Sequence, residues 1–273
     1  RYYVPREGAS VTTRGSKRQP HVADWQSAKL FFRSPQSVNI RIAISDGQPY
    51  MCRTRASDEV QMIETKGNMN AVSYRFTRVT PRTTLFGMAL ESDNGVILDN
   101  FSMRGSSGAQ LGRIPSSTLS DFARLRPYDL IVVHYGLNEA VKGNTLPLLK
   151  VYIKRMKRSI ENLRAAYPSA GILVVSVPDR DQRSAEGITT LKEVKELVAL
   201  QAQLAADCGV GFFNLYQAMG GESSMKRLVD SHRANKDYTH LSFGGGKVVA
   251  GKVFPSFIAG LENYKRRKAL EQQ

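Results

Sequence analysis

The hydrophobic pattern of the sequence changes once, near residue 99. Between residues 25 and 98 the apolar residues form short β-branched or aromatic runs, separated by turn-rich pieces such as SPQS and KGNMN. After residue 99, segments with helical spacing alternate with short, nearly continuous apolar runs. Alternation with a period of two predicts strands, and a period near 3.6 predicts helices. We therefore expect two domains, residues 1–98 and residues 99–273.

The first domain reads as a series of short strands. Four to eight strands at this spacing, with no helical period between them, predict a jelly-roll-like β-sandwich that forms an accessory module. The expected strands are residues 29–32, 38–44, 60–63, 72–79 and 84–90.

The second domain alternates strand and helix. Residues 128–136 (YDLIVVHYG) form a nearly continuous apolar run that ends in glycine, which predicts a strand buried on both faces with His134 as a core residue. A helix over residues 146–167 should follow and end before Pro168. Strands at 171–177 and 210–215 and helices at 191–206 and 244–269 complete the pattern. This order predicts an α/β fold with three layers, a doubly wound and mainly parallel sheet.

Charge and cysteine usage exclude several classes of protein. The formal net charge is +15, of which residues 1–98 contribute +6 and residues 99–273 contribute +9. Such a diffuse excess argues against specific nucleic-acid binding and allows attraction to an anionic polymer. No apolar run reaches the roughly 18 residues of a membrane helix. Cys52 and Cys208 lie far apart without metal-ligand spacing, so we expect no metal and no other cofactor.

Three short segments carry the chemistry. Residues 100–108 (NFSMRGSSG) follow a strand-like run at 96–98, and their glycines allow backbone N–H groups to face an anion. Residues 136–139 (GLNE) follow the strongest expected strand and aim an asparagine at the strand ends. Residues 237–240 (DYTH) place a carboxylate three positions before an imidazole. Asp237 can then accept from Nδ1–H of His240, which leaves Nε2 as a base. For the glycines at 244–246 we expect close helix packing rather than anion binding.

In this order the three segments resemble the SGNH (GDSL-type) hydrolases, over about residues 99–245. The resemblance implies that the N–H of Gly108 and the side-chain amide of Asn138 belong to an oxyanion hole. It also implies that His240 is the catalytic base and that Asp237 orients it. Glu139 stands where the family usually has Asp, which leaves the asparagine donor unaffected.

The nucleophilic serine of the family has no match in the sequence. No GDS motif occurs, Ser45 begins the scrambled order SDG, and Ser102, Ser106 and Ser107 lie within the glycine loop itself. We therefore expect this chain to be the C-terminal piece of a longer polypeptide whose first strand and serine lie upstream. The β-sandwich would then interrupt the hydrolase domain, as in peptidoglycan O-acetylesterase-type SGNH proteins. The other interpretation is a degenerate relative without a nucleophile.

The resemblance implies a serine ester hydrolase, a carbohydrate O-acetylesterase, located in the periplasm, in the cell envelope or outside the cell. Its substrate would be an acylated carbohydrate or another ester, and an anionic cell-wall polymer is a further partner. Two alternatives remain: an inactive carbohydrate-binding protein, and a lipase or acylhydrolase with a non-sugar ester substrate. Arg104 and Trp25 are weak candidates for substrate binding. For Arg104 and Arg180 we favour solvent exposure, and for Trp25 a place in the sandwich core.

Overall fold

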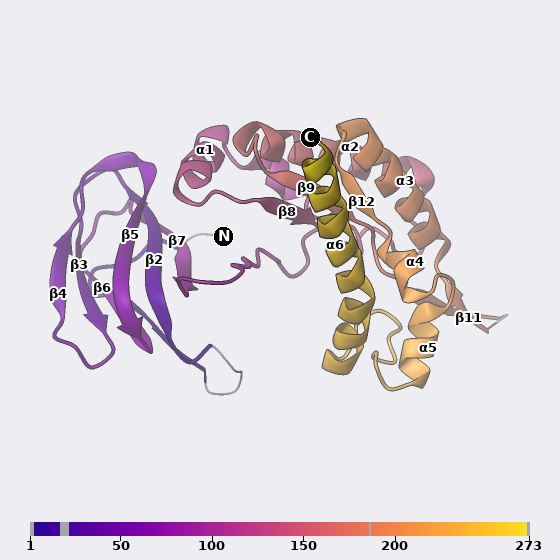
Figure 1. Cartoon of the computed structure of the whole chain (residues 1–273), viewed down its shortest axis with the longest axis horizontal. Helices are drawn as coiled ribbons and strands as arrows, with labels where there is room; N and C mark the ends of the chain where they lie inside the picture. Colours follow the sequence, from indigo (N-terminus) through magenta and orange to yellow (C-terminus); the bar gives the residue numbers. More distant parts are fainter. Residues whose placement is uncertain (1–2, 17–21, 186, 272–273) are drawn as a thin grey trace. The chain divides into compact units, whose positions relative to one another are not determined.

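The computed structural model of the protein describes residues 3–16, 22–185 and 187–271, and the chain forms two compact units (Figure 1). The first unit consists of Arg1–Ser102 and Pro115–Pro127. The second consists of Met103–Ile114 and Tyr128–Gln273. The chain therefore enters the second unit, returns to the first for one short segment, and then completes the second.

Within the described residues, the first unit has two antiparallel sheets of order β1-β6-β3-β4 and β5-β2-β7. Their strands are β1 (Ser10–Arg14), β2 (Trp25–Ser34), β3 (Asn39–Ile44), β4 (Tyr50–Arg53), β5 (Ser57–Met69), β6 (Ala71–Arg78) and β7 (Thr84–Glu91). Apolar side chains of β2, β3, β5 and β6 from both sheets share one core. The five expected strands are present. The sequence pattern missed β1 and β4, which are short strands with largely exposed side chains at the two edges of one sheet.

Helix α1 (Ser116–Leu125) belongs to the first unit although it follows residue 99 in the sequence. Its Phe122 ring contacts the rings of Phe31 and Phe86, at centroid distances of 5.6 and 5.4 Å. Its Asp121 carboxylate accepts from the N–H of Val60 at 2.9 Å. The helix thus covers the sheet formed by β5, β2 and β7 with both aromatic and polar contacts.

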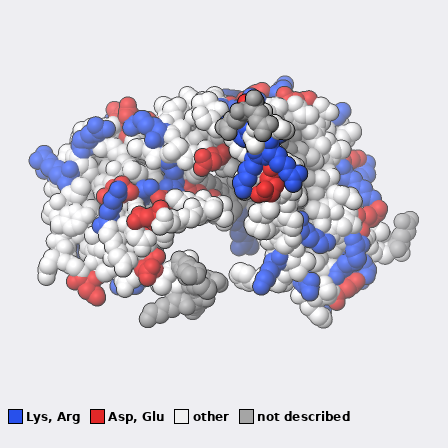
Figure 2. Space-filling view, viewed as in Figure 1, with Lys and Arg blue, Asp and Glu red and all other residues white. Residues whose placement is uncertain are grey.

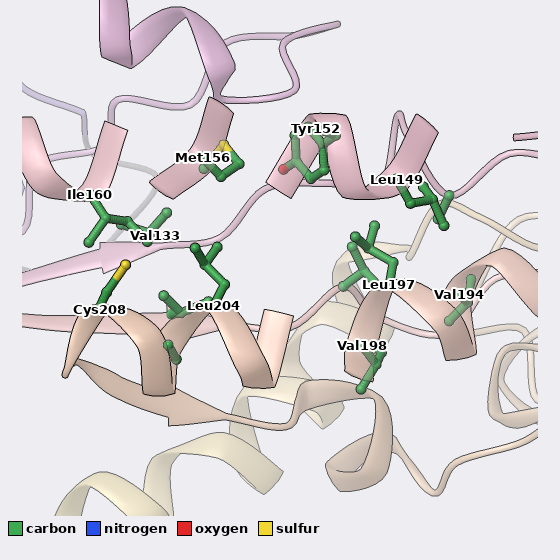
Figure 3. Packing of buried hydrophobic residues seen from close by; sticks show 14 of the residues in the cluster. Val133, Leu149, Tyr152, Met156, Ile160, Val194, Leu197, Val198, Leu204 and Cys208 are labelled. Atoms are coloured by element: carbon green, nitrogen blue, oxygen red, sulfur yellow. The ribbon is translucent and has the colours of Figure 1, made fainter. Parts of the chain in front are cut away.

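The second unit is built on a parallel sheet of order β12-β9-β8. Helices α2 and α3 pack on one face of this sheet, and Val133 of β8 lies beside Ile160 of α2 in their shared core (Figure 3). Helices α4 and α6 pack on the other face, against Val175. The elements are η1 (Ala109–Arg113), β8 (Leu130–Val133), α2 (Leu146–Ala166), β9 (Gly171–Val175), β10 (Asp181–Ser184), β11 (Gly187–Thr190), α3 (Lys192–Cys208), β12 (Gly211–Phe213), α4 (Leu215–Met219), α5 (Ser224–Asp230) and α6 (Phe243–Glu271). A parallel sheet between two helical layers is the expected α/β arrangement.

Strand β8 corrects one expectation from the sequence. It pairs with β9 only and forms an edge of the described sheet, and Leu130 and Val132 are 44% and 46% exposed. His134, expected in the core, is exposed as well. The run is therefore buried on the single face that meets α2, because nothing described covers the other face. The strand-like residues 96–98 form no strand, and Val96 is 98% exposed.

The charges do not gather into one basic face in the view of Figure 2, where Lys and Arg alternate with Asp and Glu. Among the described residues, no helix is both long enough and apolar enough to span a bilayer.

Candidate active site

The loop of residues 234–242, which we term the histidine loop, brings Asp237 and His240 into direct contact. Nδ1 of His240 lies 2.7 Å from Oδ2 of Asp237. The other carboxylate oxygen accepts from the N–H groups of Thr239 and His240, at 2.9 and 3.0 Å. This is the contact expected from the spacing of the two residues. A carboxylate on Nδ1–H fixes the ring tautomer and leaves Nε2 as the proton acceptor.

The environment of Asp237 keeps its carboxylate ionised. Partial burial raises the pKa of Asp237, but the hydrogen bond with the His240 ring and the two backbone N–H groups outweigh it and hold the pKa below its usual value. A charged Asp237 can therefore stabilise the imidazolium that forms when His240 accepts a proton. The ring itself is open to solvent, with 71% of the His240 side chain exposed.

The histidine loop is closed by backbone bonds and by one tight glycine contact. The N–H of Asn235 donates to the carbonyl of His240 at 2.8 Å, and the N–H of Tyr238 donates to the carbonyl of Asn235 at 3.0 Å. A Cβ on Gly245, in the first turn of α6, would lie 1.8 Å from the carbonyl oxygen of Arg233. At Gly245 the structure confirms the close packing expected for the glycines at 244–246.

Residues 104–108 and 136–139, which we term the oxyanion loops, bring Gly108 and Asn138 to the same residue. The N–H of Gly108 donates to Oγ of Ser106 at 3.1 Å, and Nδ2 of Asn138 donates to the backbone carbonyl of Ser106 at 3.0 Å. Gly108 has a φ of +84°, and a Cβ there would lie 2.5 Å from the ring of Tyr135. A side chain at position 108 would therefore meet both backbone strain and a clash.

Side chains from α2 and α3 hold the oxyanion loops. The Tyr152 hydroxyl donates to the carbonyl of Ser107 at 2.9 Å, and burial together with the charge of Glu139 raises the pKa of Tyr152, so the proton stays in place. Nε2 of Gln201 donates to the carbonyl of Tyr135 at 2.8 Å, while its Oε1 accepts from the N–H of Val177 at 2.9 Å. Gln201 thus ties together the segments that leave β8 and β9. Sequence reasoning missed both supports.

The structure shows different surroundings for the residues that were weak candidates for substrate binding or solvent exposure. Arg104 is exposed at the start of the first oxyanion loop, as expected. Trp25 is 4% exposed in the core of the first unit. This corrects its role as a substrate-binding candidate, because a buried ring cannot stack on a sugar. Arg180 is also corrected: it is half-buried and donates to two carbonyls of the chain rather than facing solvent.

No serine completes the site in the part of the chain that the structure describes, since no serine hydroxyl there hydrogen-bonds to the His240 ring. A cavity of about 310 Å³ lies near Tyr167, Gly171 and Gly211, at the amino ends of β9 and β12. The turn of residues 136–139 follows the carboxyl end of β8, where a parallel sheet places its site, so this cavity is not part of it.

Comparison with known sequences defines the class of protein. The sequence pattern of the GDSL-like lipase/acylhydrolase family matches residues 72–245, which is more than half of the chain. The chain belongs to this family of carboxylic ester hydrolases. The matched residues include Gly108, Asn138, Asp237 and His240. A search of curated proteins found no match.

Three solved structures are similar to this chain at low sequence identity, and one of them shares its fold. A peptidoglycan O-acetylesterase is similar with a TM-score of 0.72 and 20% identity, over 93% of this chain and 69% of that one. A carbohydrate acetylesterase from Sinorhizobium meliloti has a TM-score of 0.40 and 19% identity, over 60% of this chain and 72% of that one. A family two carbohydrate esterase from Clostridium thermocellum, in complex with cellohexaose, has a TM-score of 0.37 and 13% identity, over 94% and 93%. Only the first of these supports an argument on the fold.

Proposed function

We propose that this protein is a serine ester hydrolase that removes acetyl groups from carbohydrates, with its nucleophilic serine on a segment upstream of this chain. The observation that carries the proposal is the contact of 2.7 Å between Nδ1 of His240 and Oδ2 of Asp237. This acid and base lie in the same unit as the two donors Gly108 and Asn138. The family match to acylhydrolases gives the reaction class.

In the proposed reaction His240 takes the proton of the serine while the serine oxygen attacks the acetyl carbonyl carbon. The carbonyl electrons move to its oxygen, and that oxyanion accepts from the N–H of Gly108, the side-chain amide of Asn138 and the N–H of the serine. The oxyanion takes the place of Ser106 as their acceptor. Collapse of the intermediate breaks the bond to the sugar oxygen, which receives its proton from His240. Water activated by His240 then hydrolyses the acetyl-serine.

Strand β8 supports a place for the upstream segment. Within the described residues, one edge of β8 has no ladder partner for its backbone N–H and C=O groups, and Leu130 and Val132 are exposed. Unpaired edges and exposed apolar strand residues favour the addition of a further strand. A parallel strand added at this edge would end beside the Asn138 turn. A serine directly after such a strand would lie where its oxygen can meet both donors.

We propose a separate, carbohydrate-binding role for the first unit. Two antiparallel sheets around one core support a β-sandwich accessory module in residues 1–98, with a carbohydrate as its ligand, beside a hydrolase domain in residues 99–273. The diffuse positive charge favours an anionic cell-wall polymer as the substrate or its carrier. Such a substrate places the protein in the periplasm, in the cell envelope or outside the cell. The structural likeness to a peptidoglycan O-acetylesterase agrees with this substrate class.

The test uses the full-length protein, including the region upstream of Arg1, with an aryl acetate as substrate. His240→Asn should lower kcat by about 10⁴-fold or more, because the serine loses its base. His232→Asn is the matched control: it is an exposed histidine at a φ of +57°, which asparagine tolerates. This control should keep wild-type turnover.

Turnover that survives His240→Asn would contradict the acid–base assignment. A folded full-length protein with no turnover, but with binding to a polysaccharide, would favour the inactive carbohydrate-binding protein. Turnover with long-chain acyl esters and none with acetylated sugars would favour a lipase or acylhydrolase.

A further inference from the structure

The segment that leaves β9, residues 178–181, contacts both halves of the proposed site. Nη1 of Arg180 donates to the backbone carbonyls of Ala140 at 3.2 Å and Leu137 at 3.4 Å. These two carbonyls lie on either side of Asn138 in the chain. One guanidinium group therefore holds the turn that carries the side-chain donor of the oxyanion hole.

The next residue reaches the histidine loop. The N–H of Asp181 donates to the carbonyl of Tyr238 at 3.2 Å, and Tyr238 directly follows Asp237. Two neighbouring residues of one segment thus bind the donor side and the base side of the site.

The segment is itself held by buried carboxylates. Asp179 is 0% exposed and accepts from Oγ of Ser224 at 3.1 Å and from the N–H of Met225 at 2.9 Å. Asp181 is 4% exposed and accepts from the N–H of Lys226 at 2.6 Å. Oγ1 of Thr190 lies within hydrogen-bond distance of both carboxylates. A segment fixed by so many buried polar contacts provides a rigid support.

We propose that Arg180 is a positioning residue for ester hydrolysis, which sets the Asn138 turn relative to the histidine loop. This inference rests on the proposed function. Arginine suits the role because its planar group carries several donors, stays charged at all working pH values and can reach two carbonyls at once. Loss of this clamp would move Asn138 away from the developing oxyanion, and a displacement of about 1 Å costs on the order of 100-fold in rate.

The competing role for Arg180 is direct contact with an anionic substrate. The two roles make different kinetic predictions, because a substrate contact contributes mainly to binding and raises KM when it is lost. A positioning residue contributes through the transition state, so its loss lowers kcat with little change in KM.

The experiment compares Arg180→Met, Arg180→Lys and the control Arg183→Met in the full-length protein. Arg183 lies on β10 and is exposed. With an aryl acetate, Arg180→Met should lower kcat by about 10–100-fold at unchanged KM. Arg180→Lys should recover part of the loss, and Arg183→Met should match the wild type. An unchanged kcat in either Arg180 variant, or an effect confined to KM, would overturn the inference.

A second measurement keeps this inference separate from the proposed function. In the full-length protein, the NMR signals of the Asn138 side-chain amide and of the Tyr238 and His240 amides report on both loops without any turnover. Arg180→Lys should shift the Asn138 signals, and Arg183→Met should leave them in place. Unshifted Asn138 signals would overturn the positioning role even if the enzyme is active, whereas an inactive wild type with shifted signals would contradict only the proposed function.

Discussion

The two sides of the site are built in different ways. On the base side, four consecutive residues supply the proposed acid and base and the two N–H groups that hold the carboxylate. On the oxyanion side, Gly108 and Asn138 are 30 positions apart and depend on Tyr152 and Gln201 from two helices. The base side is thus a local structure that stands in solvent, and the oxyanion side is a product of tertiary packing.

Substitutions on the two sides should therefore have different consequences. Changes within the histidine loop should remove chemistry and leave stability nearly untouched, since His240 is 71% exposed at its side chain. Changes around the oxyanion loops should couple activity to stability, because partly buried hydrogen bonds connect those loops and their flanking residues to α2 and α3.

Replacing the side-chain donor should give the largest effect on the oxyanion side. Asn138→Ala should lower kcat by about 10²–10³-fold at nearly constant KM, because one donor to the oxyanion is lost. Glu139→Gln, one position further along the turn, is the control and should stay within about twofold of the wild type, since the carboxylate is not one of the donors. Steady-state kinetics on the full-length protein would check this. A rise in KM alone would show that Asn138 contributes binding and not transition-state stabilisation.

Removing the link between the strand ends should lower stability. Gln201→Leu removes the hydrogen bonds that Gln201 makes with the carbonyl of Tyr135 and the N–H of Val177, at a cost of about 1–3 kcal/mol in the free energy of unfolding. Gln203→Leu, an exposed position on the same helix, should change it by less than about 0.5 kcal/mol. Urea unfolding of both variants gives the comparison. Equal stability of the two would contradict the role of α3 in holding the oxyanion side.

Residues 178–181, which contact both sides of the site, should make the free energy of unfolding depend on pH. Burial and the neighbouring Asp179 raise the pKa of Asp181 to about 6. A raised carboxyl pKa favours the protonated form in the folded protein, so this contribution to stability is complete below about pH 4 and is lost as the pH rises through about 6.

Asp181→Asn mimics the protonated form at every pH. It should raise the free energy of unfolding at pH 8 by on the order of 1–2 kcal/mol and flatten its slope between about pH 4 and 7. Asp207→Asn, an exposed carboxylate on α3, should leave the slope unchanged. Urea unfolding as a function of pH measures both slopes. A slope that persists in Asp181→Asn would contradict the raised pKa.

The same contrast explains what the sequence predicts. The Asp237–His240 contact follows from a spacing of three residues, and the main strands and helices follow from hydrophobic period, so local patterns reach both. The sequence did not predict the roles of Arg180, Tyr152 and Gln201. Each of them donates to a backbone carbonyl far away in the chain, and no sequence spacing indicates such a contact. Their signal was weak: Arg180 lies in a polar segment directly after an apolar strand, where sites in parallel sheets gather.

The expectations that failed share a physical cause. The run at 128–136 is apolar enough for a strand buried on both faces, yet β8 is an open edge. Residues 96–98 likewise have strand composition without a strand partner. Composition reports what a segment can bury, and only the neighbouring elements decide whether it is buried.

Covalent labelling identifies the nucleophile itself. The full-length protein, treated with a fluorophosphonate that modifies activated serines, is digested and the modified peptide is identified by mass spectrometry. We predict one modified serine, upstream of Arg1 and directly after an apolar strand-like run, and no labelling in His240→Asn. Modification of Ser106, Ser107 or another serine of this chain, or labelling that persists in His240→Asn, would contradict the account.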